Sequence, residues 1–378
     1  MATGSDWGEG TIGESASEGR TRQTQAELGR QFPGAKLSAK THTPEAREQM
    51  AENIVRTTLS ATPEEMRAGR RWYSDAHRDA VHLAQGIDPE SRQAQLHTRA
   101  RYTPPVKDPR AVAREAGNIS ALSPAMDWGK NVLAAKEVHD LTPEHVSAMR
   151  QNVADISKAA QTRRALNKVN KSGVDDGGAA YDAHRQATAA KEESRAAARG
   201  PLAGKALNSQ STVNILKAHD IHTGAIEPEE AFNVGKPGQG QYLKTGNFFH
   251  TINNPRDPDS TTIDTRSADI GMGVRHPWKT PRGLQSPATY DVHVGAHHEV
   301  RDMLRPMGFK YAHQVQATSW LADKRAATVV TGGKHRVGED ISAVHRGALQ
   351  EPPNQPGPAA KKMTGINTIG RNRHGDDL

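Results

Sequence analysis

Apolar residues recur at intervals of three and four along much of the chain, and they seldom alternate with polar residues. Spacing by three and four is typical of amphipathic α-helices, whereas alternation is typical of strands. The clearest helix begins at Thr62-Pro63-Glu64-Glu65, where a threonine that can cap a helix precedes a proline and two carboxylates. Its apolar positions are Met66, Trp72, Tyr73, Ala76, Ala80, Val81 and Leu83. The pattern predicts a mainly α protein.

Other segments carry the same helical signals on both sides of this helix. They are a helix start at Thr43-Pro44-Glu45, a mostly buried helix at 111–122, a start near Trp128, helical patterns at 213–218 and from Phe248, and a final pair at 299–306 and 311–325. Ser123-Pro124 follows the buried helix, and a proline close behind a helix is a common stop signal.

Composition divides the chain into five parts. Only 34% of the residues are apolar and 4% are aromatic, so a packed core cannot fill the whole length. Residues 1–44 are expected to form a flexible N-terminal arm, and residues 346–378 a flexible basic tail. Between them we expect a helical region at 45–157, an Ala-rich charged insertion or linker at 158–200, and a second helical region with a hairpin-like turn at 201–345.

Charge and cysteine content narrow the possible chemistry. A formal net charge of +7 favours a polyanionic partner, such as a nucleic acid, through counterion release. The chain has no cysteine, which excludes disulfides, thiolate zinc sites and iron–sulfur clusters. No run approaches the roughly 18 apolar residues of a membrane-spanning helix, and no apolar centre of a signal peptide follows Met1. We therefore expect a cytoplasmic protein with no membrane partner and no cofactor.

A glycine-punctuated turn and a lone carboxylate after it are the strongest candidates for chemistry. Gly238 and Gly240 allow backbone N–H groups to approach a phosphate, and Lys236 beside them is a further candidate clamp. Asp264 could stabilise the positive charge that develops on a sugar when an N-glycosidic bond breaks. Lys244 could attack the same sugar carbon and form a Schiff base.

Three segments stand in a fixed order along the chain. They are Leu122-Ser123-Pro124 followed by Asp127 and Asn131, the turn followed by Lys244-Thr245-Gly246-Asn247, and Ile263-Asp264-Thr265-Arg266. Together they resemble the helix-hairpin-helix DNA glycosylase superfamily, which includes endonuclease III. The resemblance implies a helix-hairpin-helix glycosylase-like helical core that binds DNA, with Asp264 as the catalytic carboxylate for excision or modification of a base. It also implies that Ser123, Asn131 and Arg266 face the DNA.

An enzyme that acts on a base must take it out of the stack, which requires an aromatic surface in the pocket. Trp128, Tyr242 and Phe248 are the candidates for stacking. Plainer roles are open as well: Asp264 can serve as a helix N-cap, Lys244 as a solvated lysine, and Phe248 as a core residue.

The histidines His293, His297 and His298 include a pair four residues apart, which could face one metal ion on a helix. No glutamate or third ligand follows in the metalloprotease pattern, so no metal site is predicted.

A second set of segments bears on the origin of the chain. The segments are Trp72-Tyr73, Ala121-Leu122-Ser123-Pro124 and His313-Gln314-Val315-Gln316. They are similar to sequences in actinobacteriophage proteins, and the similarity implies a phage origin. Two functions stay open. One is a phage DNA-binding protein with a glycosylase-like core, and the other is a non-enzymatic structural or packaging-associated protein that binds nucleic acid or protein.

Overall fold

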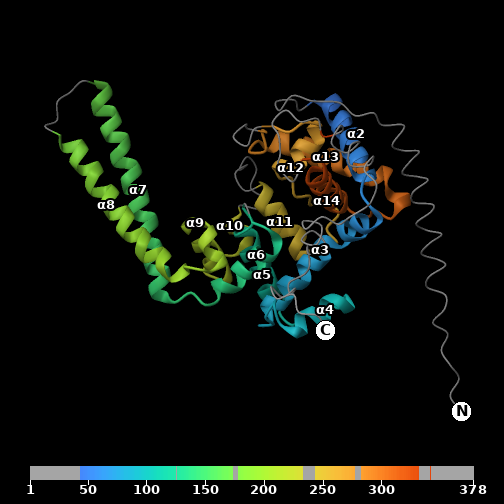
Figure 1. Ribbon diagram of the computed structural model, residues 1–378, viewed down its shortest axis with the longest axis horizontal. Coiled ribbons are helices and arrows are strands. Elements are labelled where there is room, and N and C mark those ends of the chain that lie inside the picture. The colour runs from blue at the N-terminus through green and yellow to red at the C-terminus, as the bar shows by residue number, and fades with distance from the viewer. Residues whose placement is uncertain are drawn as a thin grey trace, which may run out of the picture. The chain divides into compact units, whose positions relative to one another are not determined.

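The computed structural model describes residues 43–124, 126–172, 178–232, 243–276, 282–331 and 341. Over these ranges the chain forms helices and connecting turns with no strand, so the mainly α prediction is confirmed (Figure 1). The helices are α2 (Pro44–Leu59), α3 (Pro63–Ala84), α4 (Arg92–Ala100), α5 (Pro109–Ala121), α6 (Trp128–Val138), α7 (Pro143–Ser172), α8 (Ala179–Arg199), α9 (Thr212–His222), α10 (Pro228–Ala231), α11 (Leu243–Asn253), α12 (Thr265–Met272), α13 (Pro287–Met303) and α14 (Ala312–Thr331). Short 3-10 turns are η1 (Gly200–Leu202), η2 (Ala206–Ser209) and η4 (Arg305–Met307). Among these helices none has the length and apolar character needed to cross a membrane.

The helices form two compact units, and the boundary between the units falls inside α3. The described residues of Met1–His77 and Phe232–Gly365 form the first unit, and those of Arg78–Ala231 form the second. The sequence analysis instead divides the ordered part at 157 and 200. Contacts between residues far apart along the chain define the units, and composition carries no record of such contacts. The predicted terminal arm, apart from residues 43 and 44, and the predicted tail lie outside the described residues.

Thr43 and Thr62 cap the N-terminal ends of α2 and α3, as predicted. The Thr43 hydroxyl accepts a hydrogen bond from the Ala46 N–H at 3.2 Å. At the start of α3, the Thr62 hydroxyl accepts from the Glu65 N–H at 3.2 Å, and the Glu65 carboxylate accepts from the Thr62 N–H at 2.9 Å. This reciprocal capping box pairs N–H groups that have no partner within the helix.

Helix α2 of the first unit packs against α12, α13 and α14. Met50, Ile54 and Val55 of α2 are each 0% exposed. Full burial of such a side chain contributes about 1.5–3 kcal/mol. The core of this unit therefore joins the first described helix to helices from the C-terminal part of the chain.

Helices α3 and α14 approach each other at a glycine. A Cβ atom added to Gly69 would lie 2.1 Å from the Thr318 hydroxyl oxygen and 2.6 Å from the Thr318 Cα. Because one of these atoms belongs to the backbone, a side chain at this position would force the two helices apart. Gly69 thus sets the distance between α3 and α14.

Helix α13 begins earlier than the predicted segment at 299–306. It runs from Pro287 to Met303, and its buried face includes Tyr290, His293 and His297. In the sequence these histidines interrupt the apolar spacing, but in the structure His293 is 1% and His297 is 0% exposed. The start of α13 was missed because histidine is a polar residue that tolerates burial in its neutral form.

In the second unit, α5 packs closely against α9. A Cβ atom added to Gly117 of α5 would lie 2.8 Å from the Ile221 Cγ2 of α9 and 3.0 Å from the Pro228 Cβ. The absence of a side chain at Gly117 lets the two helices approach, and Val112 and Ile119 are buried at 3% and 0% exposure. The C-terminal end of α9 is thereby held against α5.

Helices α7 and α8 lie side by side as a hairpin, and their distal ends point away from α5, α6 and α9 (Figure 1). Small side chains line the contact between them, with Ala159 and Ala187 buried. Asn152 Nδ2 donates to the Lys191 carbonyl at 3.3 Å and to Ser194 Oγ at 3.2 Å. The segment 158–200 is thus mostly helical and mostly solvated, because alanine favours helix but provides little apolar area for burial.

Candidate functional site

Asp264 is the N-cap of α12, and both of its carboxylate oxygens hold hydrogen bonds. Oδ1 accepts from the Ser267 N–H at 2.7 Å and from the Ser267 hydroxyl at 2.9 Å. Oδ2 accepts from Trp320 Nε1 at 3.2 Å. The half-buried carboxylate therefore stabilises the start of α12 and ties it to α14. This is the capping role that the sequence analysis left open.

A chain of buried polar groups continues inward from this cap. Gln316 Nε2 donates to Ser267 Oγ at 3.0 Å, and the Tyr73 hydroxyl donates to Gln316 Oε1 at 3.0 Å. Burial raises the pKa of Tyr73, as does the charge of Asp264 to a smaller extent, so this phenol is neutral and acts as a donor. The chain orients Ser267, which in turn orients the carboxylate of Asp264.

Arg266 is committed to contacts within the first unit. Its Nη1 donates to Asp323 Oδ2 at 2.7 Å, and its guanidinium carbon lies 5.2 Å from the centre of the Trp320 ring. The structure thus brings Asp264 and Arg266 together through Trp320, which contacts both of them. With its side chain 18% exposed, Arg266 presents little surface to an external phosphate.

Lys244 and Phe248 both belong to α11, but only the lysine is near the surface. Phe248 is 8% exposed and packs against Trp72 and Tyr73, with ring centres 5.9 Å and 6.2 Å away. It has the core role that the sequence analysis left open as an alternative to base stacking. Within the described part of the chain, no hydrogen bond or ion pair joins the half-buried Lys244 to Asp264.

Ser123, Trp128 and Asn131 belong to the second unit. Asn131 is 2% exposed, so its side chain cannot contact DNA in this conformation. Trp128 Nε1 donates to Asp79 Oδ2 at 2.9 Å, which fixes the orientation of the indole within the unit. The hydroxyl of Ser123 is buried as well. The Ser123 hydroxyl and the Asn131 side chain are thus buried in the second unit, and Trp128 is hydrogen-bonded within it.

Four predicted site residues lie outside the described ranges: Lys236, Gly238, Gly240 and Tyr242.

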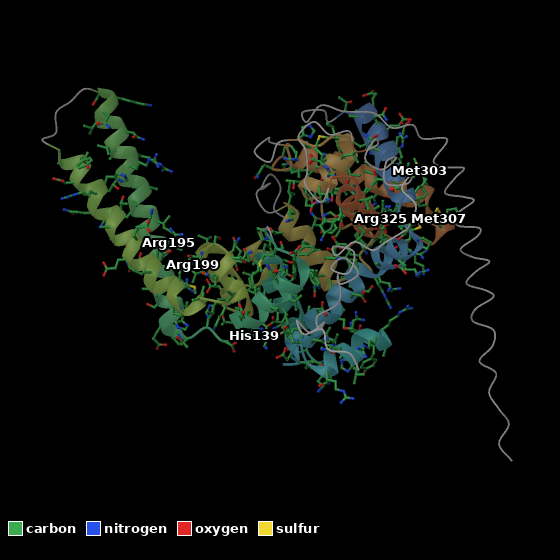
Figure 2. The ribbon with its side chains drawn as sticks, viewed as in Figure 1. His139, Arg195, Arg199, Met303, Met307 and Arg325 are labelled. Atoms are coloured by element: carbon green, nitrogen blue, oxygen red, sulfur yellow. The ribbon has the colours of Figure 1, made fainter. Side chains whose placement is uncertain are left out.

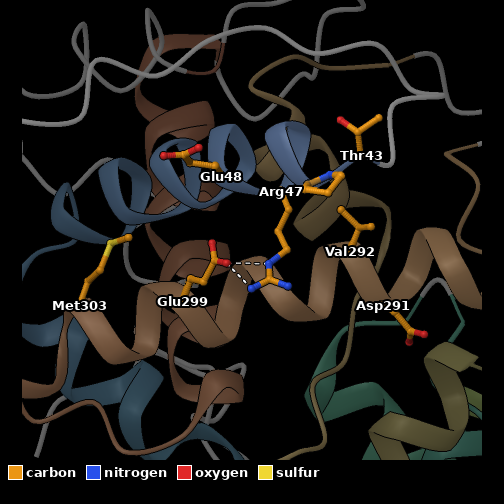
Figure 3. A pocket seen from close by; sticks show the side chains of 8 residues that line it. Thr43, Arg47, Glu48, Asp291, Val292, Glu299 and Met303 are labelled. Atoms are coloured by element: carbon orange, nitrogen blue, oxygen red, sulfur yellow. Dashed lines mark hydrogen bonds and ion pairs between the residues drawn. The ribbon is translucent and has the colours of Figure 1, made fainter.

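A surface pocket of the first unit lies between the start of α2 and one face of α13 (Figure 3). Arg47 crosses it, and Arg47 Nε donates to Glu299 Oε1 at 2.6 Å. A Cβ atom at Gly295 would lie 3.1 Å from Arg47 Cδ, so the arginine stem rests directly on α13. Arg47 and Glu299 pair with each other, Glu48 and Asp291 also line the pocket, and neither Asp264 nor Lys244 does.

Replacement of Asp264 measures its capping role. Asp264→Ala is expected to lower the free energy of unfolding of the first unit by about 1–2 kcal/mol, because the cap of α12 and the bond from Trp320 are both lost. Asp264→Ser keeps a capping oxygen and is expected to recover about half of that loss. Urea denaturation of the three proteins measures the effect. An alanine variant as stable as the wild type would contradict the capping role.

The distal half of α7 carries five cations and no acidic residue. We call residues 158–172 the basic segment; its cations are Lys158, Arg163, Arg164, Lys168 and Lys171. All five are exposed, and none forms an ion pair with another described residue. Arg164, Lys168 and Lys171 are spaced by four and three residues and therefore lie on one face of the helix. The basic segment falls within the predicted solvated insertion, and the sequence itself carries the signal of a run of cations without acids.

The other grouping that sequence analysis missed is in the second unit. Glu115 of α5, His139 after α6 and His222 of α9 offer ligand atoms that all lie within 4.8 Å of one another. His139 is labelled in Figure 2. Long intervals separate the three residues in the sequence, and no motif spacing links them. Only the packing of α5, α6 and α9 brings them together.

Comparison with known proteins identifies one similarity. Residues 36–107 match a family of unknown function, DUF7178. The matched range contains α2, α3 and α4 and includes residues of both units. No curated protein and no solved structure matches the chain. The match covers less than half of the chain, and the function has to be argued from the side chains.

Proposed function

We propose that the protein binds nucleic acid, with DNA as the expected partner, and that the basic segment of α7 contacts the phosphate backbone. The observation that carries the proposal is the set of five exposed cations over 158–172 without an acidic residue among them. Each lysine or arginine that neutralises a phosphate releases a condensed counterion, and this release drives association. This is the non-enzymatic alternative of the two functions that the sequence left open.

The other exposed arginines of the α7–α8 hairpin differ from the cations of the basic segment, because they form ion pairs. Arg150, Arg185 and Arg195 are also exposed, but each is paired with a carboxylate: Arg150 with Asp220 at 2.6 Å, Arg185 with Asp182 at 3.8 Å and Arg195 with Glu192 at 3.7 Å. Figure 2 labels Arg195 on α8. A paired arginine must lose its partner before it can contact a phosphate. The basic segment carries no such cost, and its solvated helix offers the cations without steric cover.

The arrangement of the exposed cations on α7 suggests a triple variant as the test. Arg164→Ala, Lys168→Ala and Lys171→Ala together are expected to weaken duplex DNA binding at least about tenfold. The slope of log K against log salt is expected to decrease by about 2.7, since each lost phosphate contact removes roughly 0.9. Fluorescence anisotropy with a labelled duplex across a series of salt concentrations measures both quantities.

The matched control changes the net charge by the same amount as the first triple variant. It combines Arg150→Ala, Arg185→Ala and Arg195→Ala, which removes three cations from the same hairpin at positions that hold ion pairs. The control is expected to retain most of the affinity and of the salt slope. Equal losses in the two triple variants would mean that only net charge matters, and an unchanged slope in the first variant would overturn the proposal.

Base excision or base modification at Asp264 stays a prediction from the resemblance, as does an origin in phage. Asp264 caps α12, and among the described residues no hydrogen bond or ion pair joins Lys244 to it; both observations favour the binding function over chemistry. The same duplexes with damaged or modified bases, incubated with borohydride, distinguish the two. A trapped covalent complex that disappears in Lys244→Ala, or base release that depends on Asp264, would support the enzyme.

A further inference from the structure

Three helices of the second unit place two histidines and a glutamate around one point. Glu115 lies in the middle of α5 and its side chain is 4% exposed. His139 follows the last residue of α6, and His222 is the last residue of α9. Because Gly117 allows α9 to approach α5 closely, the end of α9 delivers His222 to the carboxylate of Glu115. The convergence is a product of helix packing.

Each histidine presents one ring nitrogen to the glutamate. His139 Nε2 lies 3.0 Å from Glu115 Oε2, and His222 Nδ1 lies 2.6 Å from Glu115 Oε1. The two imidazole rings are stacked, with centres 3.9 Å apart and an angle of 19° between their planes. The three ligand atoms lie within 4.8 Å of one another, so side-chain rotations could direct them at a single ion.

The donor set suits a divalent transition metal. Two imidazole nitrogens and one carboxylate oxygen form a three-ligand zinc site of the kind that leaves a fourth position for water. Imidazole binds zinc, copper, iron and nickel well, whereas calcium and magnesium prefer oxygen ligands alone. The side chains of His139 and His222 are each 26% exposed, so the site opens to solvent on the histidine side. An ion and its water ligand can enter from there.

The surroundings of Glu115 orient it for this role. Asn118 Nδ2 donates to Glu115 Oε2 at 3.0 Å and also to the Ala135 carbonyl at 2.9 Å. Such outer partners fix the orientation of ligands around a metal. Asn118 therefore holds the Glu115 carboxylate in place toward the two imidazoles.

The plainer role of the cluster is a hydrogen-bonded ion pair that stabilises the second unit. That role explains a buried carboxylate with one imidazole partner. The geometry also suits a metal: two imidazoles with ring centres 3.9 Å apart contact different oxygens of one carboxylate. A divalent transition-metal ion can take all three side chains as ligands.

We propose that Glu115, His139 and His222 form a binding site for one divalent transition-metal ion, with Zn²⁺ as the first metal to test. The site lies within the second unit and is independent of the basic segment of α7. Its fourth coordination position is open to water. The proposal adds a metal site to a chain for which the sequence pattern alone predicts none.

The test uses the full chain after treatment with EDTA and exchange into metal-free buffer. Isothermal titration with ZnCl₂ is expected to show one equivalent of metal bound. His139→Gln and His222→Gln each remove one ligand at a partly exposed position and are expected to weaken Zn²⁺ binding by roughly 100-fold or more. Titration with Co²⁺ gives a second readout, because the visible absorption of a low-coordinate site is lost when a ligand is removed.

His219→Gln is the matched control, because His219 lies on the same helix α9 and is outside the cluster. This variant is expected to bind Zn²⁺ as the wild type does. Circular dichroism establishes that each variant is folded before its affinity is compared. Absence of saturable binding to the wild type would overturn the proposal, as would equal affinities in the wild type, His139→Gln and His222→Gln.

Discussion

The first unit is expected to lose about 6 kcal/mol of stability when the pH is lowered from 7 to 5. Three of its histidines, His293, His297 and His313, are buried at 1%, 0% and 2% exposure. Burial lowers the pKa of His293 to about 3 and the pKa values of His297 and His313 to about 4 each. All three side chains therefore remain neutral in the folded unit at pH 5.

The sign of the effect follows from proton uptake. In the unfolded chain each histidine has an ordinary pKa near 6.5 and binds a proton at pH 5, while the folded unit does not. The unfolded state binds more protons, so stability is complete above pH 6.5 and falls as the pH decreases toward 4. Each histidine contributes about 2 kcal/mol to the loss at pH 5, because one pKa unit corresponds to about 1.4 kcal/mol.

Urea denaturation at pH 7 and at pH 5 measures the loss, and hydrogen exchange assigns it to the first unit. His293→Phe tests the cause, since phenylalanine does not titrate and His293 Nδ1 is buried with no hydrogen-bond partner in the part of the chain that the structure describes. The difference between the two pH values is expected to shrink by about one third in this variant. His298→Phe removes a more exposed histidine from the same helix as a control. A wild type equally stable at both pH values would contradict the prediction.

Asp323→Ala is expected to lower the stability of the first unit by about 3–5 kcal/mol. Asp323 of α14 is 0% exposed and forms ion pairs with Arg266 and Arg275. Arg275 is itself only 4% exposed, so the variant leaves a guanidinium in the interior without the carboxylate that balanced it. The desolvation cost of the Arg275 charge is then offset less well.

Two companion variants distinguish the effect of leaving a buried charge unbalanced from the effect of simply removing a carboxylate. Asp302→Ala removes a carboxylate that is 52% exposed and pairs with Arg301 and Arg305, and it is expected to cost less than about 1 kcal/mol. The double variant Asp323→Leu with Arg275→Met removes both buried charges and is expected to recover much of the stability. Equal costs for Asp323→Ala and Asp302→Ala, measured by thermal and urea unfolding, would show that burial of the pair has no role.

The sequence predicted helix positions well where caps and apolar spacing agree. Thr43 and Thr62 begin α2 and α3 as predicted, because a cap depends on neighbours within a single turn. The start of α13 was missed, because whether a histidine is buried depends on the helices packed around it. The hairpin of α7 and α8 could be recognised as solvated from composition, whereas the pairing of the two helices could not.

The candidate sites likewise divide into features that follow from neighbouring residues and features that depend on tertiary packing. The sequence by itself determined that the protein is mainly helical and that a run of cations without acids occupies 158–172, because helix propensity and local charge are properties of adjacent residues. For Asp264 it left a catalytic and a capping role open, and the structure shows the cap of α12. Only the tertiary structure decided that Phe248 is a core residue, that Asn131 is covered, and that Glu115, His139 and His222 meet. Burial and convergence arise from contacts between helices distant in the chain, and the long intervals between such residues hold no periodic signal.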